Sequence, residues 1–130
     1  MATTDPSLFP DARGGDLVLA FDLAPVGLMV SRRRVVHSYN QAFGRMFGYG
    51  AEALVGQSLE RLYPSGDEYE HIGERALPVM RETGAYADER IMRKAGGGLF
   101  WCRVSGRAID QGDPFAAAVY VFSNRQRNRV

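Results

Sequence analysis

Few side chains in this sequence of 130 residues are suited to nucleophilic or metal chemistry. Cys102 is the single cysteine, and His37 and His71 are the two histidines. One thiol excludes a disulfide within the chain and a site built from several thiolates. Two histidines far apart in the sequence, without a partner at the i+4 position, make a poor zinc or iron site. The sequence therefore predicts no metal centre.

The sequence also lacks the motifs of an enzyme active site. There is no Ser-His-Asp set in a recognisable motif and no phosphate-binding loop. The glycine-rich stretch 95–98 joins two predicted strands, whereas a nucleotide loop runs from a strand into a helix. We therefore expect a domain that is not itself catalytic.

Trp101 and Cys102 are neighbours in the stretch LFWCRVSG, which reads as a strand. Side chains alternate between the two faces of a strand, so Phe100 and Cys102 share one face and Trp101 lies on the other. Cys102 has no histidine nearby in the sequence and is interpreted as a small buried hydrophobe, with a redox-sensing thiol as the alternative. An outward indole needs a cover, which a partner protomer could supply.

The elements that position these residues follow from periodicity and turn chemistry. Strands are predicted over 26–30, 34–39, 86–94, 99–109 and 114–122. Helices are predicted over 16–23, 41–49, 50–56 and 58–84, the last kinked or shortened near 74–78 by Pro78. Asn40 is expected to cap the second helix and Gly48 to end it. This order predicts an α+β fold, a five-stranded antiparallel sheet with helices on one face.

Composition narrows the class of partner. Lys and Arg number 16 and Asp and Glu number 15, so the net charge of +1 lacks the excess expected of a nucleic-acid binder. The longest apolar run, 17–21, is far too short for a membrane span, and the first residues lack an export pattern. We expect a cytoplasmic domain that binds neither nucleic acid nor a membrane.

Four blocks of the sequence resemble a PAS domain. They are FDLAPVGLMV, VVHSYNQAFGRMFGYGAEALVGQSLERLYP, RKAGGGLFWCRVSGRAID and AAAVYVF, and together they cover about residues 17–124. The resemblance implies the PAS fold over 16–124 with an N-terminal helix flanking the sheet. Prolines, glycines and the lack of an apolar face predict a flexible arm over 1–15, and the basic polar ending predicts the start of a linker over 125–130. It further implies a sensory module that passes a ligand, light or redox signal to an output domain.

Similar domains hold flavin or haem, and the residues of this sequence argue against both. The segment SLERLYPSGDEY lacks the asparagine-cysteine motif of light-sensing flavin domains, which argues against flavin. Haem would need an axial histidine such as His71, but this residue stands among glutamates and is expected on the wetter side of its helix. His37 is interpreted as half-buried in the sheet. An unidentified small molecule in the core is the expected occupant.

Strand alternation and helical spacing predict a set of residues that converge on one interior, and the resemblance implies that the Phe100 and Cys102 face of its strand points there. The candidate ligand-binding residues are Leu28, Val30, Phe43, Met46, Phe47, Tyr63, Met80, Ile91, Phe100, Cys102, Tyr120 and Phe122. Plain packing of a core is the alternative for the same residues. The buried hydroxyls of Tyr63 and Tyr120 would need partners, which a polar-headed ligand could supply. Arg90, Arg93 and Arg103 are expected to be solvated at the sheet, and Gly106 to mark a strand bend.

Similar PAS dimers pair through their N-terminal helices and outer sheet faces. The residues expected at such a homodimer interface are Leu17, Leu19, Ala20, Trp101, Val119 and Val121. Folding of helix 16–23 back across the outer sheet of the same chain is the alternative cover. Control of a LuxR-type DNA-binding output domain is the favoured function, and a ligand-free dimerisation module of a histidine kinase or diguanylate cyclase is the alternative. The ending SNR departs from the family's usual relay sequence.

Overall fold

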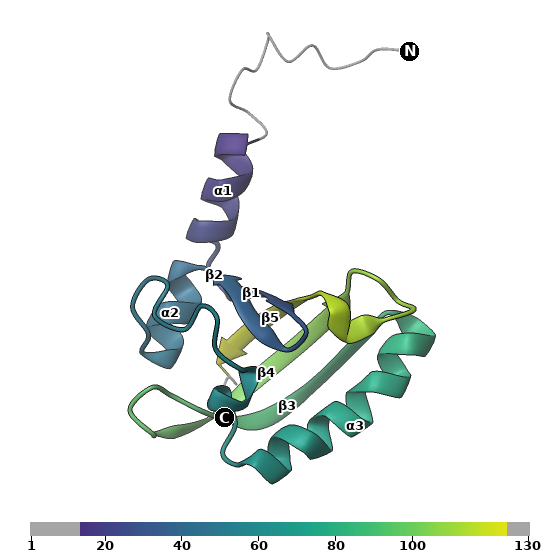
Figure 1. Cartoon of the computed structure of the whole chain (residues 1–130). Coiled ribbons are helices and arrows are strands. Elements are labelled where there is room, and N and C mark those ends of the chain that lie inside the picture. The colour runs from purple at the N-terminus through teal and green to yellow at the C-terminus, as the bar shows by residue number, and fades with distance from the viewer. Residues whose placement is uncertain (1–13, 125–130) are drawn as a thin grey trace, which may run out of the picture.

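The computed structural model describes residues 14–124 (Figure 1), so most of the predicted arm and the linker segment 125–130 lie outside the described residues. Its centre is one antiparallel sheet of five strands in the order β2-β1-β5-β4-β3. The strands are β1 (Gly27–Arg32), β2 (Val35–Tyr39), β3 (Ala85–Arg93), β4 (Leu99–Ala108) and β5 (Ala118–Asn124). The predicted α+β fold with a five-stranded antiparallel sheet is confirmed.

Two arginines form the turn of the β1–β2 hairpin. Arg33 and Arg34 both have positive φ angles, of 52° and 62°. A type I′ two-residue hairpin loop has positive φ at both central positions, and its twist matches the right-handed twist of the strands that it joins. The turn was predicted over 31–33, one residue too early, since Ser31 and Arg32 still pair with β2. The conformation has a further effect, because it sends two adjacent arginine side chains in different directions.

Helices cover one face of the sheet. They are α2 (Gln41–Phe47), α3 (Gly66–Thr83) and the 3-10 helix η1 (Leu59–Leu62), with a second 3-10 helix, η2 (Pro114–Ala116), before β5. The expected shortening of α3 at Pro78 is wrong, since the helix continues to Thr83. The ring leaves only the carbonyl of Glu74 without its helical donor, and both residues lie on the exposed side, where water can solvate it. Residues 51–56 form turns instead of the expected helix.

The inner face of β1 is the opposite of the one expected. Met29 is fully buried, whereas Leu28 and Val30 lie on the outer face. Gly27 explains the reversal, because a Cβ there would come within 3.2 Å of the Cα of Phe43. Helix α2 therefore packs closely on the Gly27 side of the strand, and the larger Leu28 and Val30 turn away from it.

The inner face of β3 is also reversed at Ile91, which is 39% exposed. Arg90 and Met92 point inward instead, and Arg90 is 8% exposed. Period two divides a strand into two faces but does not say which face is buried. Arg90 is the inner residue here because it bonds to Asp88 and Tyr63 in the interior.

Helix α1 (Gly14–Leu23) projects away from the sheet (Figure 1). None of its residues is buried, and Leu17, Val18 and Leu19 are 67%, 66% and 56% exposed. The alternative in which this helix folds back over the outer sheet face of its own chain is therefore wrong. Only its last turn meets the body of the domain.

Asn40 makes that connection. Its Oδ1 accepts hydrogen bonds from the backbone N–H of Phe43, at 3.0 Å, and of Leu28, at 2.9 Å. Its Nδ2 donates to the carbonyls of Phe21, at 2.8 Å, and Val26, at 3.0 Å. The predicted cap is confirmed, and the same buried amide also ties the end of α1 to the start of β1.

Replacing Asn40 by alanine should lower the free energy of unfolding by about 2 to 4 kcal/mol, because the cap is lost and buried backbone groups lose their partner. Urea denaturation measures the effect. Ser65→Ala is the matched control, since Ser65 caps α3 at an exposed position and its loss should cost about 1 kcal/mol. Equal losses in the two variants would contradict the role assigned to Asn40.

Candidate functional site

Five of the twelve candidate ligand-binding residues form a packed aromatic core. The rings of Phe43 and Phe47 stack with centroids 4.3 Å apart. Phe122 meets them edge-on at 5.1 and 5.4 Å, and Phe100 meets Phe47 at 5.1 Å. Met46 packs against this cluster from its side. For all of these except Phe122, which also borders a small cavity, the structure matches the packing alternative, because rings at such distances leave no room between them.

Polar groups enter the interior at the other end of the sheet. The Nε of Arg90 pairs with Asp88 at 2.7 Å, and its Nη1 donates to the hydroxyl of Tyr63 at 2.9 Å. Asp88 and Arg90 lie two apart on β3, so they share its inner face. Burial raises the pKa of Tyr63 more than the nearby Arg90 lowers it. The expectation that Arg90 is solvated at the sheet is wrong.

Tyr120 stands between the aromatic core and a second buried cluster formed by Ala76, Met80 and Ala118. Burial raises the pKa of Tyr120 to about 12, and a hydrogen bond with Ser31 lowers it in part. Its ring lies against Gly106, where a Cβ would come within 2.7 Å of the ring. Gly106 therefore provides space for a tyrosine in an unbroken strand, and the predicted strand bend is wrong.

Two small cavities flank this tyrosine. One, of about 10 Å³, lies between η1 and the sheet and is lined by Tyr63, Arg90, Tyr120 and Phe122 among others. The second, of about 20 Å³, lies under α3 and is lined by Met80 and Arg34 together with Tyr63, Arg90 and Tyr120. A space of this size holds about one water or a very small molecule. Among the candidates, Tyr63, Met80, Tyr120 and Phe122 thus line free space.

Arg34, Arg90 and Gly73 are the residues at these cavities that sequence reasoning missed. The spacing of Asp88 and Arg90 on one strand face was the available signal for Arg90. Arg34 gave no such signal, because its direction depends on a left-handed turn conformation.

Cys102 is fully buried and Trp101 is 49% exposed, which confirms that the two neighbours point to opposite faces. Burial raises the pKa of Cys102 to about 12, so the thiol remains protonated at neutral pH. His71 is exposed on α3, and His37 is exposed on β2 where it was expected to be half-buried. Within residues 14–124 there is no group of three side chains that could hold a metal ion.

The outer face of the sheet carries two apolar areas instead of one. Trp101 lies opposite Ile91, near one end of β3 and β4. Val119 and Val121 lie opposite Val30 and Leu28, on the neighbouring strands β5 and β1. The expected position of Trp101 beside Val119 and Val121 is wrong, because Val121 pairs with Ser105 on β4. Leu28, Val30 and Ile91 therefore belong to the outer face and not to the interior.

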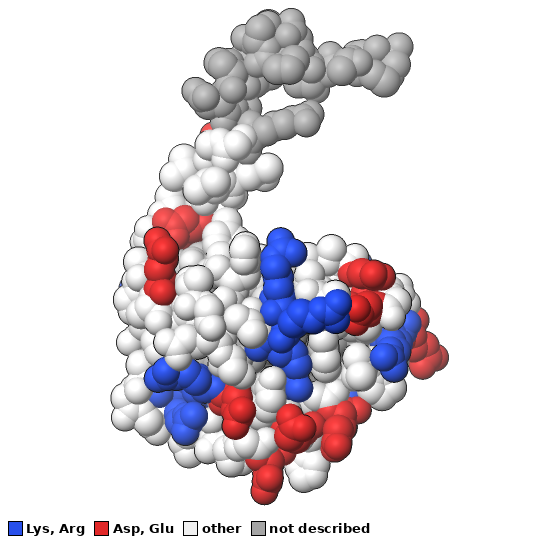
Figure 2. Space-filling view, viewed as in Figure 1, with Lys and Arg blue, Asp and Glu red and all other residues white. Residues whose placement is uncertain are grey.

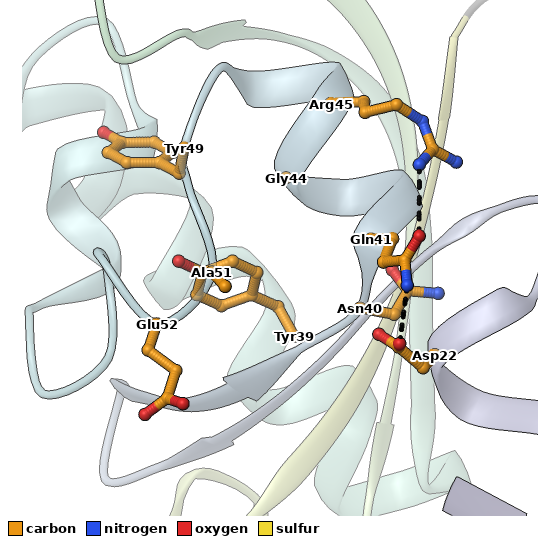
Figure 3. Close-up of a pocket in the computed structure, with 9 residues that line it drawn as sticks. All are labelled: Asp22, Tyr39, Asn40, Gln41, Gly44, Arg45, Tyr49, Ala51 and Glu52. Atoms are coloured by element: carbon orange, nitrogen blue, oxygen red, sulfur yellow. Dashed lines mark hydrogen bonds between the residues drawn. The ribbon is translucent and has the colours of Figure 1, made fainter. Parts of the chain in front are cut away.

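A larger hollow of about 440 Å³ lies on the surface where α1 meets α2 (Figure 3). Asp22, Gln41 and Arg45 form a chain along one side, with 2.7 Å between Gln41 and Asp22 and 3.5 Å between Arg45 and Gln41. On the other side the hydroxyl of Tyr39 donates to the carbonyl of Gly50 at 2.6 Å. These polar groups hydrogen-bond with one another and with the backbone. The hollow is therefore interpreted as the junction between α1 and the rest of the domain.

Charge is mixed over the surface that Figure 2 shows, where basic side chains gather in the middle of the face with acidic ones beside and below them. Arg33 and Asp113 form one such surface pair at 3.1 Å. None of the helices in the described part of the chain is long and apolar enough to cross a membrane.

Comparison with known proteins agrees with this architecture. The family model described as "PAS domain" matches residues 25–124. The PAS domain of a LuxR-family transcriptional regulator from Burkholderia thailandensis, solved in complex with ethanol, is 51% identical with a TM-score of 0.80. That alignment covers 82% of this chain and 95% of the other. A PAS domain from Colwellia psychrerythraea has the same fold, with 19% identity and a TM-score of 0.76 over 85% of this chain and 94% of its own.

A longer relative is the sensor protein TdiS of Thauera aromatica, which is 26% identical over 125 residues. The match covers 93% of this chain but only 23% of TdiS, so the chain spans less than a quarter of that protein. The family model covers most of the chain, and the strand order, the helical face and the sequence blocks agree with it. The chain therefore belongs to the PAS domain family, whose members are sensory modules of signalling proteins.

Proposed function

We propose that this PAS domain binds a small molecule between α3 and the sheet and controls an attached output domain. The observation that carries the proposal is the buried group formed by Arg90, Tyr63 and Tyr120 around small cavities. Buried polar side chains beside free space are typical of a ligand site, where a few polar groups orient a ligand within apolar walls. The domain itself is not expected to catalyse a reaction.

The cavity volumes limit the size of the ligand. Spaces of about 10 and 20 Å³ admit only a very small molecule and exclude haem or flavin without a large rearrangement. The ethanol bound by the Burkholderia thailandensis relative supports a ligand of this size.

The output domain is inferred from the same relative. The 51% identity of this chain to the PAS domain of a LuxR-family regulator favours transcriptional control in the cytoplasm. The match to the sensor protein TdiS supports the alternative of another kind of sensor protein. Ligand binding can shift a domain between two states only through different affinities for them. Tyr120 is suited to transmit such a shift, because it lies on β5 between the cavities and next to β1, whose entry is tied to α1 through Asn40.

Filling the cavity under α3 should prevent binding. We expect ethanol to shift the assigned amide NMR signals of Met80, Arg90 and Tyr120 in a saturable manner, and Ala76→Val to abolish these shifts, because the added methyl groups occupy the free space. Ala87→Val, on the exposed outer face of β3, is the control and should bind as the unmodified chain does. Saturable shifts that survive in Ala76→Val would place the ligand elsewhere.

Homodimerisation is a second candidate function, favoured by the exposed apolar residues. Leu17 and Leu19 on α1 and Trp101 on β4 are 67%, 56% and 49% exposed. With Ala20, Val119 and Val121 they form the interface proposed from the sequence, and Leu28, Val30 and Ile91 now extend its sheet part. Pairing of two copies would remove this apolar surface from water.

Trp101→Ala should weaken self-association by about tenfold or more and leave the fold intact, since large aromatic anchors carry much of the binding energy at interfaces. Sedimentation equilibrium at micromolar concentration measures the dissociation constant. Val79→Ala removes a partly exposed apolar side chain from α3, on the other side of the sheet, and serves as the control. An unchanged dissociation constant in Trp101→Ala would refute the interface.

A further inference from the structure

The two turn arginines differ in where their side chains end. Arg33 points outward and pairs with Asp113 at the surface. Arg34 points inward, where its guanidinium lies 3.8 Å from the ring centroid of Tyr69 and 4.7 Å from that of Phe115. Its Nη2 donates to the carbonyl of Tyr69 at 3.2 Å. Among residues 14–124, no carboxylate lies within ion-pair distance of Arg34.

Gly73 on α3 makes room for this guanidinium. A Cβ at this position would lie 2.8 Å from both Nη atoms of Arg34. The arginine therefore fits between the hairpin and α3 because the helix has no side chain there. This places a cation without a carboxylate partner at the edge of the 20 Å³ cavity.

Arg90 supplies a second guanidinium to the same cavity. Asp88 and Tyr63 engage its Nε and Nη1. Tyr63 acts as the acceptor in its bond with Arg90, so its own hydroxyl proton remains available. Both arginines lie near enough to Tyr63 and Tyr120 to lower their pKa values, although burial outweighs this effect.

The lining of the cavity is thus rich in donors and poor in acceptors. It includes Arg34, Arg90 and three tyrosines, Tyr63, Tyr86 and Tyr120, and no aspartate or glutamate. Asp88, beside Arg90, compensates one of the two positive charges. A partly buried cation without a counter-charge is costly, and a bound anion would remove that cost. The other walls include Ile72, Ala76 and Met80, which are apolar.

We propose that the ligand class of this cavity is a small carboxylate, of the size of formate or acetate. This inference rests on the sensor function proposed above and specifies its ligand. The carboxylate oxygens accept hydrogen bonds from the donors that Arg34 and Tyr63 present, since a guanidinium fork suits a planar carboxylate. A short alkyl group faces Ala76 and Met80. Larger anions with several charged oxygens fit neither the volume nor the apolar walls.

The hairpin offers a matched pair of variants for the test. Arg33→Asn and Arg34→Asn each remove one arginine from the turn, and asparagine tolerates the positive φ of both positions. Only Arg34→Asn changes the cavity. The probes are sodium acetate, sodium chloride at equal ionic strength, and ethanol, each added to the whole chain at pH 7 while the amide signals of Met80, Arg90 and Tyr120 are followed.

We expect saturable acetate binding that weakens by about tenfold to a hundredfold in Arg34→Asn and is unchanged in Arg33→Asn, because a charge-assisted pair is lost in the former alone. Chloride should not reproduce the shifts. If the NMR spectrum shows that Arg34→Asn is unfolded, Arg34→Gln is used instead. Glutamine keeps a longer side chain against Tyr69.

Each other outcome separates the two proposals. Ethanol binding without acetate binding would overturn the carboxylate class and retain the sensor site. Equal acetate affinity in both asparagine variants, or equal shifts with chloride, would overturn the role of Arg34. Absence of saturable binding by both acetate and ethanol would overturn the interior as a ligand site altogether.

Discussion

The side-chain amide of Asn40 joins three segments that would otherwise end separately, namely the last turn of α1, the entry to β1 and the first turn of α2. All four of its hydrogen bonds go to backbone groups, so no other residue type of similar size supplies the same donors and acceptors. The position of α2 determines which face of β1 is buried, and β1 determines where β5 and Tyr120 lie. The interior site and the projecting helix therefore share one anchor.

Local signals in the sequence predicted the order of the strands and of the main helices, but also a helix over 50–56 where the structure has turns. Asn40 and Gly48 fix the ends of α2 by capping, and alternation separates Trp101 from Cys102. These signals did not show which of the two faces of a strand is buried. Leu28 and Val30 are more hydrophobic than Gly27 and Ser31, yet close packing of α2 against Gly27 turns them outward. That packing is a contact between two elements, and no property of the strand alone reports it.

The polar part of the site was harder to predict for a related reason. An arginine on a strand is usually solvated, and Arg90 becomes an inner residue because Asp88 and Tyr63, which is distant in sequence, meet it there. Arg34 depends on backbone conformation, since the two left-handed residues of the turn send their side chains apart. The apolar candidates were easier to find, but most of them fill space and do not line it. The polar part of the proposed site therefore comes from Arg90, which was expected to be solvated, and from Arg34, whose direction the sequence left open.

Gly73 has a consequence for engineering of the domain. A glycine inside a helix costs about 0.5 to 1 kcal/mol relative to alanine, so a search for thermostable variants would favour alanine here on helix propensity. The new methyl group would compete for the space of the Arg34 guanidinium. Selection for robustness alone would thus act against the feature that positions this cation, which is a local form of the trade-off between stability and function. Gly73 therefore contributes to the proposed site through the space that it leaves for Arg34.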